Sequence, residues 1–128
     1  MKINYKLTSF FLFAFLLSLN TSANTETISG SKFVQGVMHS AKIVNGGNLT
    51  LQGVATGSIS IEEGGSFVLQ GVVNGTITNN GGNLIIQGTA NTIYANSGYT
   101  EISGIVNYIT GNGKINIKPG AIIAGRRY

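Results

Sequence analysis

Few side chains in this chain of 128 residues could carry out a reaction. The sequence contains no cysteine and no aspartate, and its one histidine is His39. These absences exclude a Ser-His-Asp triad, a Cys-His pair and a thiolate metal site. Glu62 and Glu63 are adjacent and Glu101 stands alone, whereas paired catalytic carboxylates must converge across a cleft. We therefore expect no catalytic, cofactor-binding or metal-binding residue, and a protein that is not an enzyme.

The better candidates are residues that could bind a ligand. Tyr94 and Tyr108 alternate with isoleucines, which predicts that they point outward from short strands, and Tyr99 belongs to a neighbouring strand. Exposed aromatic rings on a flat polar sheet suit sugar rings or a protein partner. The alternative is that these rings cover a sheet face or brace a turn. A surface this rich in serine and threonine could also bind ice, but we do not expect the threonines to form a regular two-rank array.

A second candidate surface is a row of glutamines. Each glutamine precedes a glycine, and the row consists of Gln35, Gln52, Gln70 and Gln87, continued by Ser103 and Lys118. Glutamines stacked on neighbouring strands can hydrogen-bond to one another along the stack. The row is therefore either a stabilising ladder or a surface that reads a ligand.

These rows exist because the chain is built from repeats. Residues 46–53 read GGNLTLQG, and the pattern returns as GGSFVLQG at 64–71 and GGNLIIQG at 81–88. The slot of the glycine pair is then filled at 97–98 and 112–113, so that successive spacings are 18, 17, 16 and 15 residues. Alignment of the Gln-Gly elements places the lost residues in the connecting segments, which surface turns tolerate.

Each repeat contains two short segments in which apolar and polar residues alternate, the mark of a strand with one buried face. A meander of hairpins could use the same strands, but the constant register favours stacked coils whose equivalent residues form ladders. The expected inward ladders are Leu51, Leu69, Ile86, Ile102 and Ile117, then Ile59, Ile77, Ile93 and Ile109, with Val54, Val72 and Ile105 in a corner. We predict an all-β, single-domain parallel β-solenoid of about four to five coils, right-handed by default, with two short strands per repeat of 15–18 residues.

The first 23 residues have the pattern of a secretory signal peptide. Lys2 and Lys6 precede an apolar run from Phe10 to Leu19, and small residues follow up to Ala23. The run is shorter than the roughly 20 residues of a membrane-spanning helix. We expect cleavage after Ala23 and no stable membrane span afterwards. A retained membrane anchor is the alternative.

The remainder, 24–128, is expected to be one repeat domain. It would consist of an irregular first coil at 24–45, regular repeats at 46–111 and a C-terminal cap at 112–128. In the cap, Lys118 and Pro119 would prevent further strand pairing. Once the signal peptide is removed, the chain keeps a small positive charge and no basic run beyond Arg126-Arg127, which gives no support to nucleic-acid binding.

The repeat pattern between Gly46 and Asn96 resembles the stalk repeats of AIDA-type autotransporter adhesins. The resemblance implies a parallel β-solenoid on the bacterial surface, with glycine pairs at the turns and a role in adhesion. Adhesins of this type carry a C-terminal membrane barrel, which we do not expect here. Bactofilin filaments are a weaker likeness, because they lack a cleavable signal and residues 1–23 have the pattern of one.

The expected function is therefore that of an exported, non-enzymatic bacterial β-solenoid, a structural or adhesion-type binding module in the periplasm or at the cell surface. The alternative is a periplasmic protein that binds a partner, as an immunity protein or chaperone does. A secreted enzyme on a β-helix is a third reading, which the missing catalytic cluster disfavours. The expected ligand is a protein or a surface glycan. A homodimer through the N-terminal coil is also expected, because Phe33 and Val34 lie in a degraded repeat with little to protect its edge.

Overall fold

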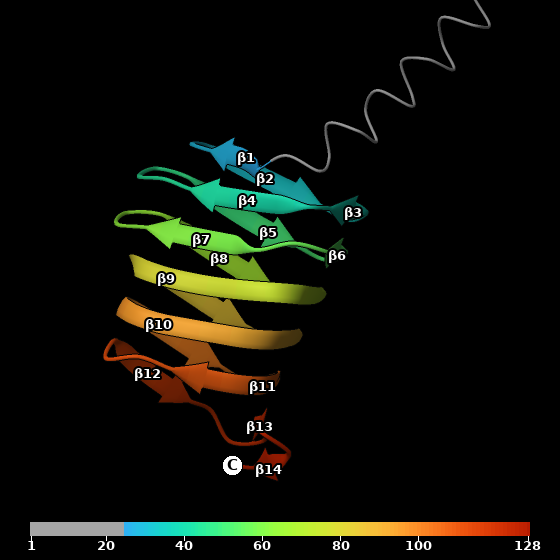
Figure 1. Cartoon of the computed structure of the whole chain (residues 1–128), viewed down its shortest axis with the longest axis vertical. Coiled ribbons are helices and arrows are strands. Elements are labelled where there is room, and N and C mark those ends of the chain that lie inside the picture. The colour runs from blue at the N-terminus through green and yellow to red at the C-terminus, as the bar shows by residue number, and fades with distance from the viewer. Residues whose placement is uncertain (1–24) are drawn as a thin grey trace, which may run out of the picture.

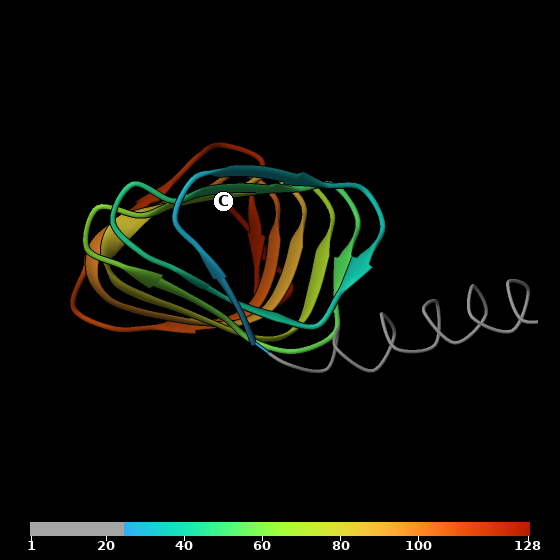
Figure 2. The same ribbon diagram turned by 90° about the horizontal axis from the view of Figure 1, so that it is seen from above.

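The computed structural model describes residues 25–128, and within them the chain winds into a stack of coils (Figure 1). Neighbouring coils pair as parallel strands, and a view along the stack shows each coil closing around one core (Figure 2). The predicted class, an all-β parallel solenoid, is confirmed, with about six turns where four to five were expected. Among the described residues, no helix is long and apolar enough to cross a membrane.

Each coil has three strands, one more than predicted, and the stack therefore has three faces. The front face of Figure 1 consists of β1 (Thr25–Ile28), β4 (Ser40–Ile43), β7 (Ile59–Glu62), the middle of β9 (Val72–Ile86) and of β10 (Thr89–Ile102), and the end of β11 (Ile105–Thr110). The back face consists of β2 (Ser31–Val34), β5 (Asn48–Leu51), β8 (Ser66–Leu69), the ends of β9 and β10, and β12 (Lys114–Ile117). The side face consists of β3 (Val37–Met38), β6 (Val54–Ala55), the starts of β9, β10 and β11, and β13 (Ile122–Ile123). The last strand is β14 (Arg126–Arg127).

The core confirms the two main inward ladders. Their members are buried or packed against the buried cluster, from Leu51 to Ile117 on the back face and from Ile59 to Ile109 on the front face. The third ladder was wrong, because Val54 and its equivalents point outward and the next residue, Ala55 in this coil, is the buried one. The inward and outward alternation of the preceding strand does not continue through the Gln-Gly turn. The side-face strand that follows has only two residues, too few to show from the sequence which side chain points inward.

The glycine of each Gln-Gly element is required by the close approach of the coil above. A Cβ atom on Gly53, Gly71 or Gly88 would lie 1.7, 1.9 or 2.1 Å from a carbonyl oxygen of the preceding coil. At Gly36, in the first coil, the same turn has no atom within 4 Å of an added Cβ. The motif is therefore a packing requirement of stacked coils and not a property of the turn alone.

Through the regular repeats the coils change length at two corners and keep it at the third. The Gln-Gly corner is constant there, since Leu51 pairs with Leu69 and Val54 pairs with Val72. In the last coil this corner is longer by two residues, because Ile102 pairs with Ile117 but Ile105 pairs with Ile122. Between β7 and β9 one residue is lost at the corner from front to back, where Ile61 pairs with Asn79 but Ser66 pairs with Asn83. Between β9 and β10 the register shifts after Ala90, at the corner from side to front. The lost residues thus lie in turns, as predicted.

Charged residues close both ends of the core. In the first coil Glu26 pairs with Ala41 and Lys32 pairs with Leu49, so both occupy inward positions, and they form an ion pair with each other. At the other end β14 turns back antiparallel to β13 and sets Arg126 opposite Ile123. Inward-pointing charges at an edge oppose the addition of further strands. The expectation that the N-terminal edge lacks protection was therefore wrong, and dimerisation through this coil, which stays a prediction, would have to displace the ion pair.

Candidate binding surface

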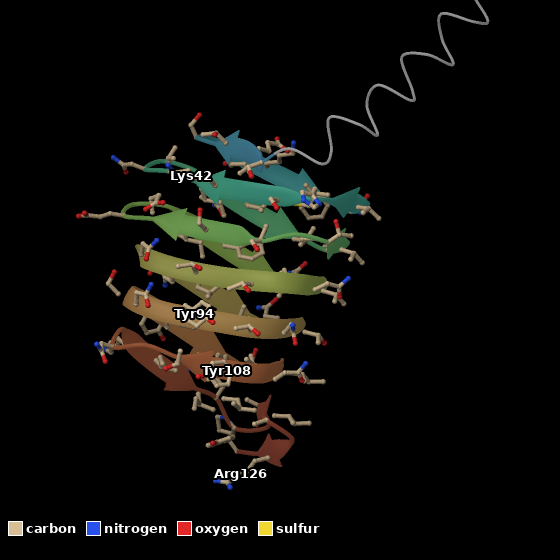
Figure 3. The ribbon with its side chains drawn as sticks, in the orientation of Figure 1. Lys42, Tyr94, Tyr108 and Arg126 are labelled. Carbon is tan, nitrogen blue, oxygen red and sulfur yellow. The ribbon has the colours of Figure 1, made fainter. Side chains whose placement is uncertain are left out.

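The front face presents two parallel columns of outward side chains. Register places Thr27, Lys42, Ser60, Thr78, Tyr94 and Thr110 in one column. The second column contains Thr25, Ser40, Ser58, Thr76, Thr92 and Tyr108. Most members of both columns are serine or threonine, but the threonines do not form a regular two-rank array, in agreement with the expectation from the sequence. Lys42, Tyr94 and Tyr108 interrupt the ranks, so that the face lacks the unbroken hydroxyl array that would favour ice binding (Figure 3).

Tyr94 and Tyr108 lie on this face in adjacent coils, and both are exposed, by 41% and 54%. Tyr94 pairs with Thr110 of the next coil, while Tyr108 pairs with Thr92 of the coil before. The two rings therefore occupy one diagonal of a square of four positions, and the two threonine hydroxyls occupy the other. We call these four residues the tyrosine square.

Tyr99 does not join this group. It lies on the back face, where it pairs with Asn83 and Lys114, and it is half-buried. Its phenolic oxygen accepts a hydrogen bond of 3.0 Å from Asn116 Nδ2 in the next coil. Its ring is thus part of a contact between coils, which corresponds to the bracing alternative for this residue.

The glutamine row is a ladder whose members bond to one another. The amides are linked through Nε2–H···Oε1 bonds of 3.4 Å from Gln35 to Gln52, 2.8 Å from Gln52 to Gln70 and 3.2 Å from Gln70 to Gln87. Ser103 continues the row and donates its hydroxyl to the Ile86 carbonyl at 3.2 Å. The predicted ladder is confirmed, and much of the hydrogen-bonding capacity of its amides is already used along the stack.

A second amide ladder lies at the corner from side to front and was not predicted. Asn107 Nδ2 donates to Asn91 Oδ1 at 3.1 Å, and Asn91 Nδ2 donates to the Asn74 carbonyl at 3.2 Å. The signal was present in the sequence, because these asparagines follow Val72, Thr89 and Ile105 at a fixed distance in each repeat. The corners of the solenoid are therefore lined with amides that satisfy each other.

Two of the described polar residues, Asn79 and Thr100, are fully buried, and Asn79 Nδ2 donates to Thr100 Oγ1 at 3.3 Å. Asn79 lies in a column that otherwise contains Ile28, Ile43, Ile61 and Ala95. Its Oδ1 accepts from the Gly82 and Gly81 backbone N–H groups at 2.9 and 3.2 Å, and its Nδ2 donates to the Tyr99 carbonyl at 3.0 Å. In the coil before, the backbone carbonyl of Glu62 accepts from Gly65 N–H at 2.9 Å. In the shorter turn after Asn79, the side-chain oxygen of Asn79 therefore takes the place of the backbone carbonyl that accepts this hydrogen bond in the coil before.

The residues with ionisable groups are dispersed over the described part of the chain. His39 Nδ1 lies 3.1 Å from Thr56 Oγ1 in the next coil, and Lys118 Nζ lies 3.4 Å from Glu101 Oε1. Within residues 25–128 no three histidine or acidic side chains lie close enough together to hold a metal ion.

The chain matches no family model, and it shows no significant similarity to a curated protein or to a solved structure. The parallel β-solenoid that the resemblance implied is confirmed, whereas none of these comparisons supports an AIDA-type adhesin specifically.

Proposed function

We propose that this protein is an exported, non-enzymatic β-solenoid that acts as a structural or adhesion-type binding module in the periplasm or at the cell surface. The solenoid supplies a rigid rod with one flat face, and the tyrosine square supplies a contact point on that face. The observation that carries the proposal is the exposure of Tyr94 and Tyr108 at positions where every other coil except that of Lys42 has serine or threonine. If these columns had only a structural role, serine or threonine would be sufficient at these two positions as well.

A second candidate, a periplasmic protein that binds a protein partner, is favoured by apolar residues on another side. Phe33, Val37 and Ile105 are 56%, 71% and 42% exposed, and the last two belong to the outward column of the side face. Exposed apolar columns of this kind suit a protein interface. This candidate differs from the first in the surface that it uses, which makes the two separable by mutation.

The export part of the proposal is tested by expressing the whole chain in a Gram-negative host and analysing each cell fraction. We expect protein that begins at Asn24 in the periplasm, the outer surface or the medium. Intact protein that retains Met1 and stays in the cytoplasm would refute export.

The binding part is tested with the purified protein and a double variant, Tyr94→Thr with Tyr108→Thr, which restores the residue type of the neighbouring coils. Adhesion of protein-coated beads to envelope preparations should fall in the double variant. The matched control, Val37→Thr with Ile105→Thr, should leave adhesion unchanged. The reverse pattern would favour the second candidate and contradict the first.

A further inference from the structure

The front face also indicates the chemical class of its ligand, an inference that rests on the binding function proposed above. We propose that the tyrosine square and the hydroxyl ranks next to it bind a neutral polysaccharide chain. Four observations support this assignment: the arrangement of rings and hydroxyls, the unused hydrogen-bonding groups, the charge of the face and the polarity of its surroundings.

In the tyrosine square, rings and hydroxyls alternate in both directions. Each tyrosine has a threonine as its outward neighbour, both along its own strand and in the adjacent coil. Strand geometry puts neighbouring coils about 4.8 Å apart and outward residues of one strand roughly 7 Å apart. A pyranose ring has an apolar face of C–H groups and a rim of hydroxyls. One tyrosine ring can cover such a face while the adjacent threonine hydroxyl bonds the rim.

The side-chain hydroxyls of this face, unlike the side-chain amides at the corners, do not form hydrogen bonds with other described side chains. The corner glutamines and asparagines bond to one another from coil to coil. In contrast, no hydrogen bond joins the side-chain hydroxyls of the tyrosine square, or of Thr76 and Thr78 above it, to another described residue. Each of these hydroxyls can donate and accept, which is also the property of a sugar hydroxyl.

The face is also uncharged where the rings lie. In the two outward columns from Ser58 to Thr110 every residue is serine, threonine or tyrosine. Lys42, the one cation of these columns, lies three coils above Tyr94 (Figure 3). Glu62, the next outward residue of β7 after Ser60, lies two coils above Tyr94. An acidic polysaccharide would therefore meet no cation within the tyrosine square, and a cationic ligand would meet no carboxylate there. A neutral chain is therefore the ligand with the smallest desolvation cost on this surface, because it carries no charge that would lose its hydration without gaining a partner.

The surroundings of the rings favour a sugar over a protein. Protein interfaces centre on anchors surrounded by apolar contacts that exclude water. The neighbours of Tyr94 and Tyr108 on the face are hydroxylic, whereas the exposed valines and isoleucines lie on the side face. The hydroxyl ranks continue upward from the square to Thr76, Thr78, Ser58 and Ser60. This continuation fits a chain of several sugar units and predicts tighter binding of longer oligosaccharides.

The test uses the purified protein and four neutral hexasaccharides, namely cellohexaose, laminarihexaose, mannohexaose and chitohexaose, each with its disaccharide. Because the sequence has no tryptophan, intrinsic fluorescence comes from the tyrosines, two of which are Tyr94 and Tyr108, and calorimetry gives the affinity. We expect at least one hexasaccharide to bind at least tenfold more tightly than its disaccharide. In Tyr94→Thr with Tyr108→Thr, affinity should fall at least tenfold. Tyr128→Phe, which changes an exposed ring outside the face, should bind as the parent does.

Three results would overturn the assignment. The first is that no hexasaccharide binds at millimolar concentration, and the second is that the double variant binds as well as the parent. The third is that polygalacturonate binds more tightly than every neutral sugar, since this would show that charge governs the site. If the double variant loses adhesion to envelope preparations while neutral sugars fail to bind, the binding function stands and the glycan assignment falls. Circular dichroism of each variant shows whether a loss of binding reflects unfolding.

Discussion

Replacement of Gly71 by alanine tests the packing of the coils most directly. The added Cβ would stand 1.9 Å from the Gly53 carbonyl oxygen and 2.5 Å from that of Gln52, whereas real Cβ contacts under 3.0 Å essentially never occur. The coil must therefore move by about 1 Å, roughly a fifth of the spacing between coils. Neither atom is at the end of a flexible side chain, so the backbone itself has to yield.

The cost follows from the bonds that this movement breaks. Gly71 N–H donates to the Leu51 carbonyl at 2.9 Å, and Val72 N–H donates to the Gly53 carbonyl at 3.0 Å. A displacement of this size takes both bonds out of range, at about 1–3 kcal/mol for each group left unpaired. Disturbed packing adds about 1–3 kcal/mol to this loss. The less flexible unfolded chain acts in the opposite direction and offsets at most about 1 kcal/mol of it. We expect the free energy of unfolding to fall by roughly 3–6 kcal/mol.

Gly36→Ala is the matched control, because it changes the same Gln-Gly turn in a coil with no described coil above it. Neither glycine has a φ angle in the left-handed region, so alanine is not strained by the backbone at either position. We expect Gly36→Ala to change stability by less than about 1 kcal/mol. Urea unfolding followed by circular dichroism and by tyrosine fluorescence measures both, and coincident transitions establish that unfolding is two-state. Equal losses at the two positions would refute the reasoning from stacked coils.

Three further predictions concern the core and its ends. Ile77→Ala should lower the free energy of unfolding by about 2–5 kcal/mol and Thr78→Ala far less, and equal losses in urea melts would contradict their facing. Asn79→Ala leaves the buried Gly82 N–H and the part-buried Gly81 N–H without their acceptor and should cost on the order of 2–4 kcal/mol; a loss under about 1 kcal/mol would mean that water replaces the side chain. Glu26→Ile with Lys32→Leu extends the apolar columns to the edge and should promote self-association in analytical ultracentrifugation. A variant that associates no more than the parent would show that the ion pair is not the barrier.

The sequence allowed prediction of those features that repeat with period two over several residues. Leu51 and Ile59 belong to strands of four residues, so their inward facing could be predicted and is confirmed. The side face could not be predicted in this way, because its strands of two residues carry no period and Val54 was consequently assigned to the wrong side. For the same reason the side-face strand of each coil was not recognised, and two strands per coil were predicted where the structure has three.

The candidate binding surface could likewise be predicted only in part. The outward facing of Tyr94 and Tyr108 follows from alternation with Ile93 and Ile109 and could be predicted. Their diagonal arrangement with two threonines depends on which residues pair between coils, and one lost residue in a turn changes that register. The burial of Asn79 could not be predicted, because alternation places a polar residue at an inward position and only the turn beside it explains why.

The unequal lengths of the coils have a consequence for how the chain finds its fold. In a solenoid of identical repeats, a strand can align with the wrong neighbour and still pair all of its residues, which produces slipped and swapped species. Here successive glycine-pair spacings run 18, 17, 16 and 15, so each misplacement by one repeat leaves a residue without room in a turn. A slip would also bring the Asn79 turn under a coil whose corner has a different length. The shortening series therefore distinguishes each repeat from the next, and it discourages misassembly during folding at the cost of a perfectly regular stack.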